Sequence, residues 1–506
     1  MNTQHLITER YSDQIVGVIS CFDRIVITGT LPDICHAGAM AAQLTRRKML
    51  LFDYGEFVNP IRNMLHDNAR EVAAAHGAEI EPIRKLKDFR KEDRIKAVIA
   101  ARGLENGLVH VFSAMENCNC FKPWHDKNTQ KTYLKASGGR CSHYYFYFLD
   151  DLLGLLYVRV PTWAPFRLQI CFNGHNWTAN HLRSSGTAFK MNDNAFVDID
   201  DFDGAQKLAD GLAPVELQRR LDHYARLACP VHGLFPAGWH WSIMQIEYAT
   251  DIIFKRPEDL APLYESLKMR AIQEVKIDDV ATFLGRNGLS ANFDGDGGSR
   301  YNVLIEGTRL RHSLGHTSIK LYDKFSHILR IETTTNDVSF FKHHRKVEHR
   351  EGGFSMKDAP VKKTIHSLGI VRELLDASNW RYISFISRLE DDASGRKELG
   401  RVTRKVEDDS GRPHRGINFF LKEDLELVLA VLRPEHLISG VTARLLRRLL
   451  PDWRGSRISR AIRRLREHGL LKKIAGMFKY YVTQTGFKVF TAAMRVRECE
   501  IIPALS

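Results

Sequence analysis

HYYFYFLDDLLGLLYVRVPTWAPFRLQICF, residues 143–172, contains three stretches rich in aromatic and β-branched residues. Turn residues separate these stretches at Asp150–Gly154 and at Pro161–Pro165. Such stretches between turn signals are typical of consecutive antiparallel strands. The segment therefore predicts an antiparallel meander, and we expect an α+β domain built on an antiparallel sheet over residues 116–340.

Upstream of the meander, strand and helix patterns alternate. QIVGVISCFDRIVITGTLP (14–32) predicts a strand pair, helical patterns follow near 36–48 and 56–76, and LVHVFSAM (108–115) predicts a buried strand. Alternation of this kind is typical of α/β proteins. We therefore expect an α/β domain over residues 1–115, so the fold class is α+β with several domains.

The segment from 417 to 506 predicts a winged helix-turn-helix, joined to the rest by a helical and charged linker region, 341–416. Helical patterns precede Pro451, and SRISRAIRRLREHG (456–469) predicts a third helix that ends at a glycine. A hairpin around Ala475-Gly476 follows. In the third helix the apolar residues share one face, as a helix that is anchored in a core and reads a groove requires.

Net charge is concentrated in the same segment. The chain has 74 Lys and Arg against 60 Asp and Glu, and residues 441–497 hold 15 of the basic residues with two acids. Such a surplus indicates a polyanionic partner, with duplex DNA the usual target of the motif and structured RNA the alternative. The side chains that we expect to contact nucleic acid here are Arg454, Arg457, Arg460, Arg463, Arg464, Lys472, Lys473 and Lys479. The alternative for them is a solvated basic face.

A tyrosine between two lysines is the strongest candidate for chemistry. In IEGTRLRHSLGHTSIKLYDKF (305–325), strand alternation places Lys320, Tyr322 and Lys324 on one side. Two ammonium groups beside a phenol would stabilise developing charge and lower the phenol pKa, which suits a nucleophile in phosphodiester transesterification. Arg309 and Arg311 add cations upstream. The alternative is a Tyr–Lys surface that binds nothing.

Two sets of side chains could hold metal ions. His240, Glu247 and Asp251 could bind Mg²⁺ or Mn²⁺, or they could be polar residues of a half-buried strand. A second set could ligate zinc, although its spacings differ from those of the usual zinc knuckles. That set is Cys118, Cys120, Cys141 and His143. Neither G-x-x-x-x-G-K-[ST] nor G-x-G-x-x-G occurs, so we expect no nucleotide cofactor.

Further residues in the body of the chain are candidates for binding. Trp163 and Arg167 lie among aromatic residues, a mixture that suits stacking on unpaired bases, although some of these aromatics could belong to the core. FDRIV places Asp23 and Arg24 inside an apolar strand, either as a buried pair that satisfies itself or with Asp23 as an active-site acid.

SIKLYDK (318–324), followed by LRIE (329–332), resembles the strand pair of replication initiators of filamentous phages and rolling-circle plasmids. In those enzymes a tyrosine nicks one DNA strand and keeps the 5′-phosphate. The resemblance implies roles for Tyr322, its two lysines, Arg330 and Glu332. The His–hydrophobe–His metal motif that such initiators usually carry is absent from this sequence.

Most of the chain resembles long bacterial proteins commonly labelled MarR-family transcriptional regulators, through SCFDRIVITGTLP, SHYYFYF, NGHNW and EYATDI. That resemblance implies DNA binding by the tail. Three functions stay open: a metal-dependent DNA nickase of a mobile element, a regulator that binds DNA as a homodimer, and an RNA-binding component of a ribonucleoprotein. The polar N-terminus and the lack of an apolar run of about 18 residues lead us to expect a cytoplasmic protein without a membrane partner.

Overall fold

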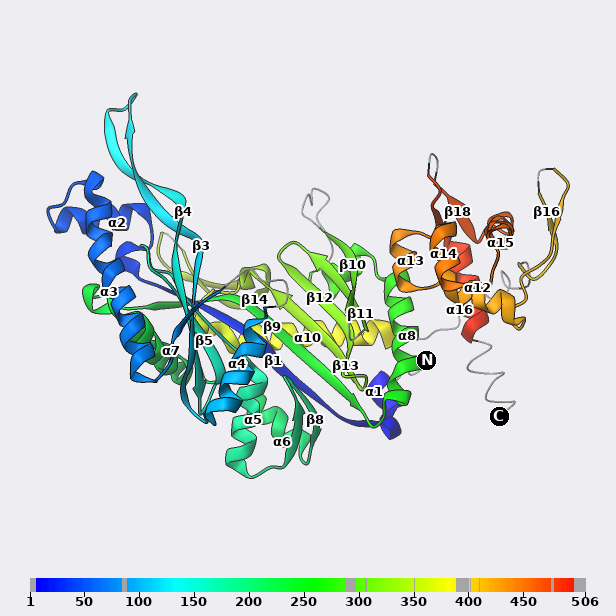
Figure 1. Cartoon of the computed structure of the whole chain (residues 1–506), viewed down its shortest axis with the longest axis horizontal. Helices are drawn as coiled ribbons and strands as arrows, with labels where there is room; N and C mark the ends of the chain where they lie inside the picture. Colours follow the sequence, from blue (N-terminus) through cyan, green and yellow to red (C-terminus); the bar gives the residue numbers. More distant parts are fainter. Residues whose placement is uncertain are drawn as a thin grey trace.

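The computed structural model describes residues 6–83, 89–286, 297–304, 307–349, 351–387, 400, 402–408, 410–474 and 477–495. Within these residues the central feature is one sheet of 11 strands (Figure 1). Neighbouring strands are antiparallel throughout the sheet, except that β2 and β3 run parallel. The α+β class predicted from the sequence is therefore confirmed.

In spatial order the strands of the large sheet are β10 (Gly297–Leu304), β11 (Gly307–Leu314), β12 (Thr317–Lys324), β13 (Ile328–Thr335), β9 (His240–Phe254), β1 (Ile15–Thr30), β6 (Leu168–Phe172), β5 (Gly154–Pro161), β4 (Lys131–Asp150), β3 (Gly107–Asp126) and β2 (Ile80–Pro82). Two-stranded sheets are formed by β7 (Phe189–Asn192) with β8 (Ala195–Ile199), β14 (Lys342–Glu348) with β15 (Phe354–Pro360), β16 (Val406–Glu407) with β17 (Pro413–His414), and β18 (Leu471–Lys473) with β19 (Tyr480–Val482).

The helices are α1 (Ile7–Arg10), α2 (Ala37–Arg46), α3 (Tyr54–Ala75), α4 (Lys91–Arg102), α5 (Gly174–Ser185), α6 (Phe202–Asp210), α7 (Pro214–Ala228), α8 (Pro257–Glu274), α9 (Ile277–Phe283), α10 (Leu368–Ser387), α12 (Lys422–Val431), α13 (Pro434–Ser439), α14 (Ala443–Leu449), α15 (Gly455–Glu467) and α16 (Gln484–Arg495). Among the described helices, none combines the length and the apolar character that crossing a bilayer demands.

The meander predicted over residues 143–172 is confirmed, because β4, β5 and β6 are consecutive neighbours in the sheet. The strand pair predicted over 14–32 is wrong. That segment is the single 16-residue strand β1, which lies between β9 and β6 and pairs antiparallel with both. Both partners are distant in sequence, and local periodicity carries no information about them. The expected α/β domain is therefore absent, and its boundary at 115/116 falls inside β3.

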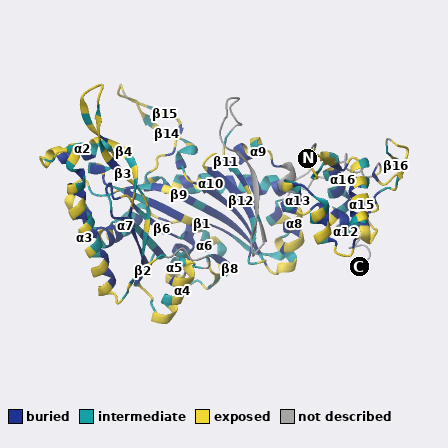
Figure 2. Ribbon diagram, turned by 45° about the horizontal axis from the view of Figure 1, so that its top comes forward, coloured by how far each residue is buried: buried dark blue, intermediate teal, exposed yellow. Residues whose placement is uncertain are grey.

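Alternating residues of the sheet serve two different faces. Ile246, Ile252 and Leu321 belong to the main core, together with residues of α3, α7 and α10. On the opposite face, Ile19 and Ile253 pack against α5, α6 and β8 in a smaller core. Figure 2 shows the strands largely buried along the middle of the sheet. Polar side chains occupy the part of the second face beyond this smaller core.

The C-terminal helices have a core of their own, and within the described part of the chain it shares no residue with the core of the sheet. In α15 the predicted apolar face is buried, as shown by Ile458, Ala461, Ile462 and Leu465. β18 and β19 pair after α15, and the turn predicted at Ala475-Gly476 lies outside the described residues.

Candidate functional site

Tyr322 lies on the polar face of the sheet with both of its neighbouring lysines, as strand alternation predicts. The Tyr322 hydroxyl donates a hydrogen bond of 2.6 Å to Oε2 of Glu332 on β13. The Lys320 ammonium pairs with the other oxygen of Glu332, and the Lys324 ammonium donates to the side chain of Asn194. Each lysine is buried and already has a partner within the protein.

The pKa of Tyr322 is raised well above its usual value, first because the phenol is buried and next because the charge of Glu332 lies beside it. The prediction that the two lysines lower the pKa of Tyr322 is therefore wrong. The physical reason is the position of Glu332, which pairs with Lys320 and accepts the hydrogen bond of Tyr322. A carboxylate in this position can take the proton of the phenol, so activation would come from a base.

Arg330, on β13, joins acidic residues of two other strands, β9 and β1. Its Nε and Nη2 each lie 2.6 Å from an oxygen of Asp251, and its Nη1 lies 3.3 Å from Oδ1 of Asp23. His175 stands between the same two acids, at 3.4 Å from Asp23 and 3.8 Å from Asp251. Asn194 donates a 2.6 Å hydrogen bond to Asp23. Buried charges of both signs thus satisfy one another.

Local structure explains how these side chains meet. The pairing of β1 with β9 shifts register between Phe22 and Arg24, and Asp23 lies at this irregularity. α5 begins after Asn173, whose side chain caps the helix by accepting from the His175 backbone N–H. Asn194 lies in the turn between β7 and β8. A bulge, a helix start and a tight turn therefore converge on β13.

Three carboxylates form the tightest acidic cluster. Asp23, Glu247 and Glu332 each place one oxygen within 4.8 Å of the others, and they come from the adjacent strands β1, β9 and β13. Burial raises the pKa of Glu247, and the neighbouring Glu332 raises it further. Burial alone would also raise the pKa of Asp23, but Arg330 and His175 hold it well below its usual range. Oxygen ligands at this spacing suit a hard divalent cation.

The structure does not bring together the predicted metal set His240, Glu247 and Asp251. His240 is exposed at the start of β9, and seven residues of strand separate it from Glu247 by about 23 Å. Asp251 is fully buried and held at both oxygens by Arg330. Of the three, only Glu247 belongs to the acidic cluster.

The predicted zinc ligands share one face of the β3–β4 pair. Cys141 Sγ lies 3.8 Å from Nδ1 of His143, and Cys118 and Cys120 follow on the partner strand. Among the described residues, the acidic cluster is the one group of three or more potential ligand atoms within 4.8 Å of one another. The Cys118 and Cys141 thiols contact each other, but among the described residues no third ligand atom joins them within this distance, so zinc binding stays a prediction.

The remaining predicted contact residues of the body lie at separate places. Trp163 is half-buried, with its ring 6.2 Å from that of Tyr54, and Arg167 is exposed and donates to a backbone carbonyl. Arg311 pairs with Lys320 across β11 and β12, so Arg309 and Arg311 extend the face that carries Tyr322. The structure brings these two arginines toward the acidic cluster, but not Trp163 or Arg167.

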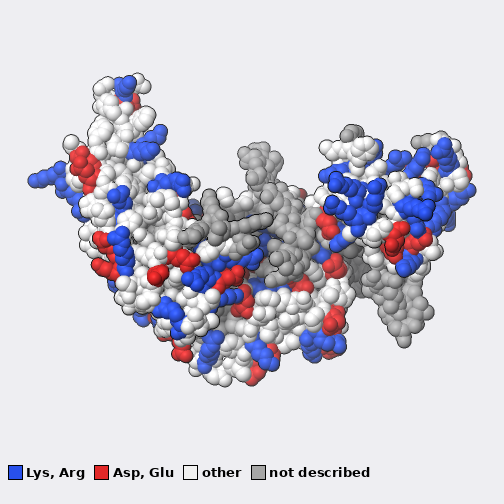
Figure 3. All heavy atoms as spheres, in the orientation of Figure 1, with Lys and Arg blue, Asp and Glu red and all other residues white. Residues whose placement is uncertain are grey.

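Basic side chains gather on the C-terminal helices (Figure 3). The predicted contacts that are exposed are Arg454, Arg460, Arg463, Lys472 and Lys473, and those that are half-exposed are Arg457 and Lys479. Arg457 pairs with Glu423 at 2.5 Å and lies over the ring of Trp453.

Arg464 was also predicted to contact nucleic acid, but it points the other way. Its guanidinium pairs with the buried carboxylate of Asp424 on α12. Arg460 and Arg464 lie one turn apart on the same side of α15, and they differ because the half-buried Arg464 faces Asp424 whereas Arg460 is exposed.

Sequence reasoning did not predict that His175 and Asn194 join the acidic residues, and it left Asp23 undecided. A charged residue inside an apolar strand was the signal for Asp23. Its partner is Arg330 rather than the neighbouring Arg24, which is exposed. For Asn194, in a turn between short strands, the sequence carries no distinguishing signal.

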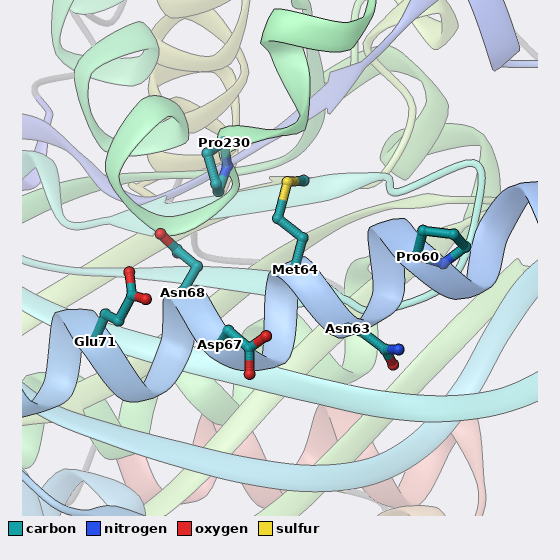
Figure 4. Close-up of a pocket in the computed structure, with 7 residues that line it drawn as sticks. All are labelled: Pro60, Asn63, Met64, Asp67, Asn68, Glu71 and Pro230. Carbon is teal, nitrogen blue, oxygen red and sulfur yellow. The ribbon is translucent and has the colours of Figure 1, made fainter.

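A separate surface pocket of about 450 Å³ lies between α3 and Pro230 (Figure 4). Its lining residues are Pro60, Asn63, Met64, Asp67, Asn68, Glu71 and Pro230. None of them belongs to the acidic cluster or to the predicted sites, so the pocket adds nothing to these assignments.

No protein-family model, curated protein or solved structure matches the chain. Evidence about function therefore comes from the residues and from their geometry.

Proposed function

We propose that the chain is a nucleic-acid-processing enzyme of a mobile element or plasmid, which cuts one DNA strand with Tyr322 and a divalent cation. The observation that carries the proposal is the 2.6 Å hydrogen bond from Tyr322 to Glu332, beside the carboxylates of Asp23 and Glu247. The nucleophile, the base and the hard oxygen ligands thus lie on four neighbouring strands, β12, β13, β9 and β1. A nucleophile, a base and a cation site are what phosphodiester transfer requires, and Glu332 would serve both as the base and as a ligand.

The chemical step follows from these positions. The Tyr322 oxygen attacks phosphorus while its proton passes to Glu332, and the bond from phosphorus to the 3′ oxygen breaks. The tyrosine keeps the 5′-phosphate, and the leaving 3′ oxygen takes a proton from water. A Mg²⁺ or Mn²⁺ ion held by Asp23, Glu247 and Glu332 would supply positive charge to the phosphate oxygens and relieve the repulsion between the acids.

We further propose that residues 417–495 form a winged helix-turn-helix that binds the target DNA. The order α14, α15, β18, β19 and the buried apolar side of α15 support this proposal. Exposed Arg454 and Arg460 would then face the phosphates or the base edges of a groove.

The test incubates purified protein with labelled single-stranded DNA and Mg²⁺ or Mn²⁺, and separates the products on a denaturing gel. We expect a nick and a protein-linked DNA band that Tyr322→Phe abolishes and Glu332→Gln reduces at least about 100-fold, as is typical for loss of a general base. Tyr11→Phe, at a half-buried tyrosine that precedes β1, is the matched control. Absence of cleavage, together with nucleic acid in the preparation that RNase removes, would leave an RNA-binding scaffold instead.

A second function is favoured by one specific observation: Tyr322 and both lysines have partners within the protein. A non-enzymatic regulator could use this buried network for stability alone. It would bind DNA as a two-fold dimer with its recognition helices about 34 Å apart. Light scattering of the protein with and without duplex DNA, and the spacing of protected half-sites, test this alternative.

A further inference from the structure

The β3–β4 hairpin extends beyond the rest of the sheet. β4 pairs with β5 only from His143 onward, whereas its pairing with β3 continues to Lys131. Residues 117–140 therefore form a two-stranded ribbon, which we call the hairpin arm, and it projects from the sheet in Figure 1.

The two faces of the hairpin arm differ in character. On one face Phe121 and Leu134 are buried, and Phe121 contacts the ring of Tyr54. That face anchors the arm to the body of the protein. On the opposite face, Lys122 and Trp124 with their partners Lys135 and Tyr133 are exposed toward the tip, whereas Cys120 is buried and Cys118 is half-buried toward the base.

The exposed face carries two cross-strand pairs. Trp124 lies opposite Tyr133, and these side chains are 51% and 44% exposed. Lys122 lies opposite Lys135, and the Lys135 ammonium lies 5.2 Å from the centre of the Trp124 ring. Like charges directly opposite each other destabilise a strand pair, so a negatively charged partner between Lys122 and Lys135 would stabilise this one.

The net charge of the hairpin arm is positive. Its lysines and arginine are Lys122, Lys127, Lys131, Lys135 and Arg140, and its one acid is Asp126. A partner with negative charges and flat apolar groups would satisfy both the lysines and the aromatic rings.

We propose that the hairpin arm binds an unpaired segment of nucleic acid, with bases stacked on Trp124 and Tyr133 and phosphates on Lys122 and Lys135. Stacking on exposed aromatic rings, beside cations that follow the backbone, is how proteins hold single strands. The proposal deepens the proposed function and rests on it for the class of ligand.

The position of the arm supports this assignment. Cross-strand partners share a face of a sheet, so the side of the arm that carries Lys122 and Trp124 continues, past the buried Cys120 and the half-buried Cys118, into Glu116 on β3. Arg159 on β5 binds Glu116 at 2.7 Å, and it contacts Gln169 on β6. This polar path leads across the same face toward Glu247, and the seven strand spacings from β3 to β12 amount to about 34 Å. The eight residues from Glu116 to Trp124 add about 26 Å along the arm, so one nucleic-acid strand that contacts both Trp124 and Tyr322 must follow the arm as well as cross the sheet.

The experiment measures fluorescence anisotropy of the full-length protein with labelled dT20, and with a 20-base-pair duplex, in EDTA so that no strand is cut. We expect the double variants Trp124→Ala/Tyr133→Ala and Lys122→Glu/Lys135→Glu to bind dT20 at least about tenfold more weakly, which corresponds to about 1.4 kcal/mol. Affinity for the duplex should change less than about twofold. Lys207→Glu, at an exposed lysine of α6, is the matched control.

Unchanged dT20 affinity in both double variants would overturn the proposal, and so would an equal loss for the duplex, which would assign the arm to duplex binding. Thermal unfolding identifies a variant that fails to fold. If the Trp124→Ala/Tyr133→Ala variant does not fold, the Lys122→Glu/Lys135→Glu variant decides the outcome. Tyr322→Phe should bind dT20 like the wild type. Tight dT20 binding without any nicking would refute the catalytic proposal but not the proposal that the hairpin arm binds nucleic acid. A wild-type protein that does not bind dT20 would refute the proposal for the hairpin arm.

Discussion

At the scale of single residues, burial decides what each charged group can do. Arg330 is fully buried and neutralises Asp251 and Asp23, so it serves as the internal counter-ion of the polar face. Tyr322 differs from Arg330 because its hydroxyl donates a hydrogen bond to a single carboxylate, that of Glu332, which also contacts Lys320. Arg330 therefore balances the buried charges, whereas Tyr322 is the candidate for chemistry.

Asp323 allows a prediction about pH. Its side chain turns away from the polar face, Oδ1 is buried without a hydrogen-bond partner, and burial raises the pKa of the carboxyl from 3.8 to about 6. Between about pH 4 and 6 the folded state holds this proton more tightly than the unfolded state does. Its contribution to stability is therefore full below pH 4 and is lost as the pH rises through 6.

Asp323→Asn keeps the shape of the protonated acid and should remove this loss. We expect the variant to match the wild type at pH 4 and to exceed it by about 1 kcal/mol at pH 8, the lower end of the cost of an unsatisfied buried group. Urea unfolding at both pH values measures the difference. Asp278→Asn, at the N-terminus of α9, is the control, and an equal effect of Asp323→Asn at both pH values would contradict the assignment.

At the scale of elements, α15 shows how one helix serves two purposes. Its apolar side joins the C-terminal core, and Arg464 reaches back to Asp424. Arg460 is exposed, with its Nε near the Ser456 carbonyl of the same helix. Arginines four positions apart on one helix therefore differ in what they touch.

This difference predicts two separate phenotypes. Arg460→Ala should weaken duplex binding and reduce the salt slope by about 1, without loss of stability, because one phosphate contact is removed. Arg464→Ala should lower the free energy of unfolding by about 1–3 kcal/mol, because Asp424 loses a partner while buried. Binding at several salt concentrations and urea unfolding compare the two variants, and a reversal of the two phenotypes would refute the orientation of α15.

At the scale of the whole molecule, the large sheet and the C-terminal helices have separate cores. No residue is common to the cluster around Ile246 and the cluster around Leu446. Units with separate cores can unfold separately, so the chain need not behave as one two-state unit.

Calorimetry should therefore resolve two unfolding transitions. Leu446→Ala should lower one of them and Ile246→Ala the other, each by the roughly 2–5 kcal/mol that a large-to-small core substitution costs. Each variant is the control for the other. A single transition that both substitutions shift would show that the cores are coupled.

The sequence by itself determined the features that depend on near neighbours. Alternation placed Lys320, Tyr322 and Lys324 on one face, turn residues marked the strands of residues 143–172, and helical periodicity identified the buried side of α15. These patterns need only the repeat of a strand or a helix, which a short window contains.

Only the tertiary structure decided which strands are neighbours, and with them the acidic cluster. Asp23, Glu247 and Glu332 are far apart in the chain and meet because β1, β9 and β13 are adjacent. Because β13 pairs with β9, Arg330 binds Asp251, whereas His240 lies at the far end of β9. Strand order and register follow from packing over the whole sheet, so local periodicity cannot specify them.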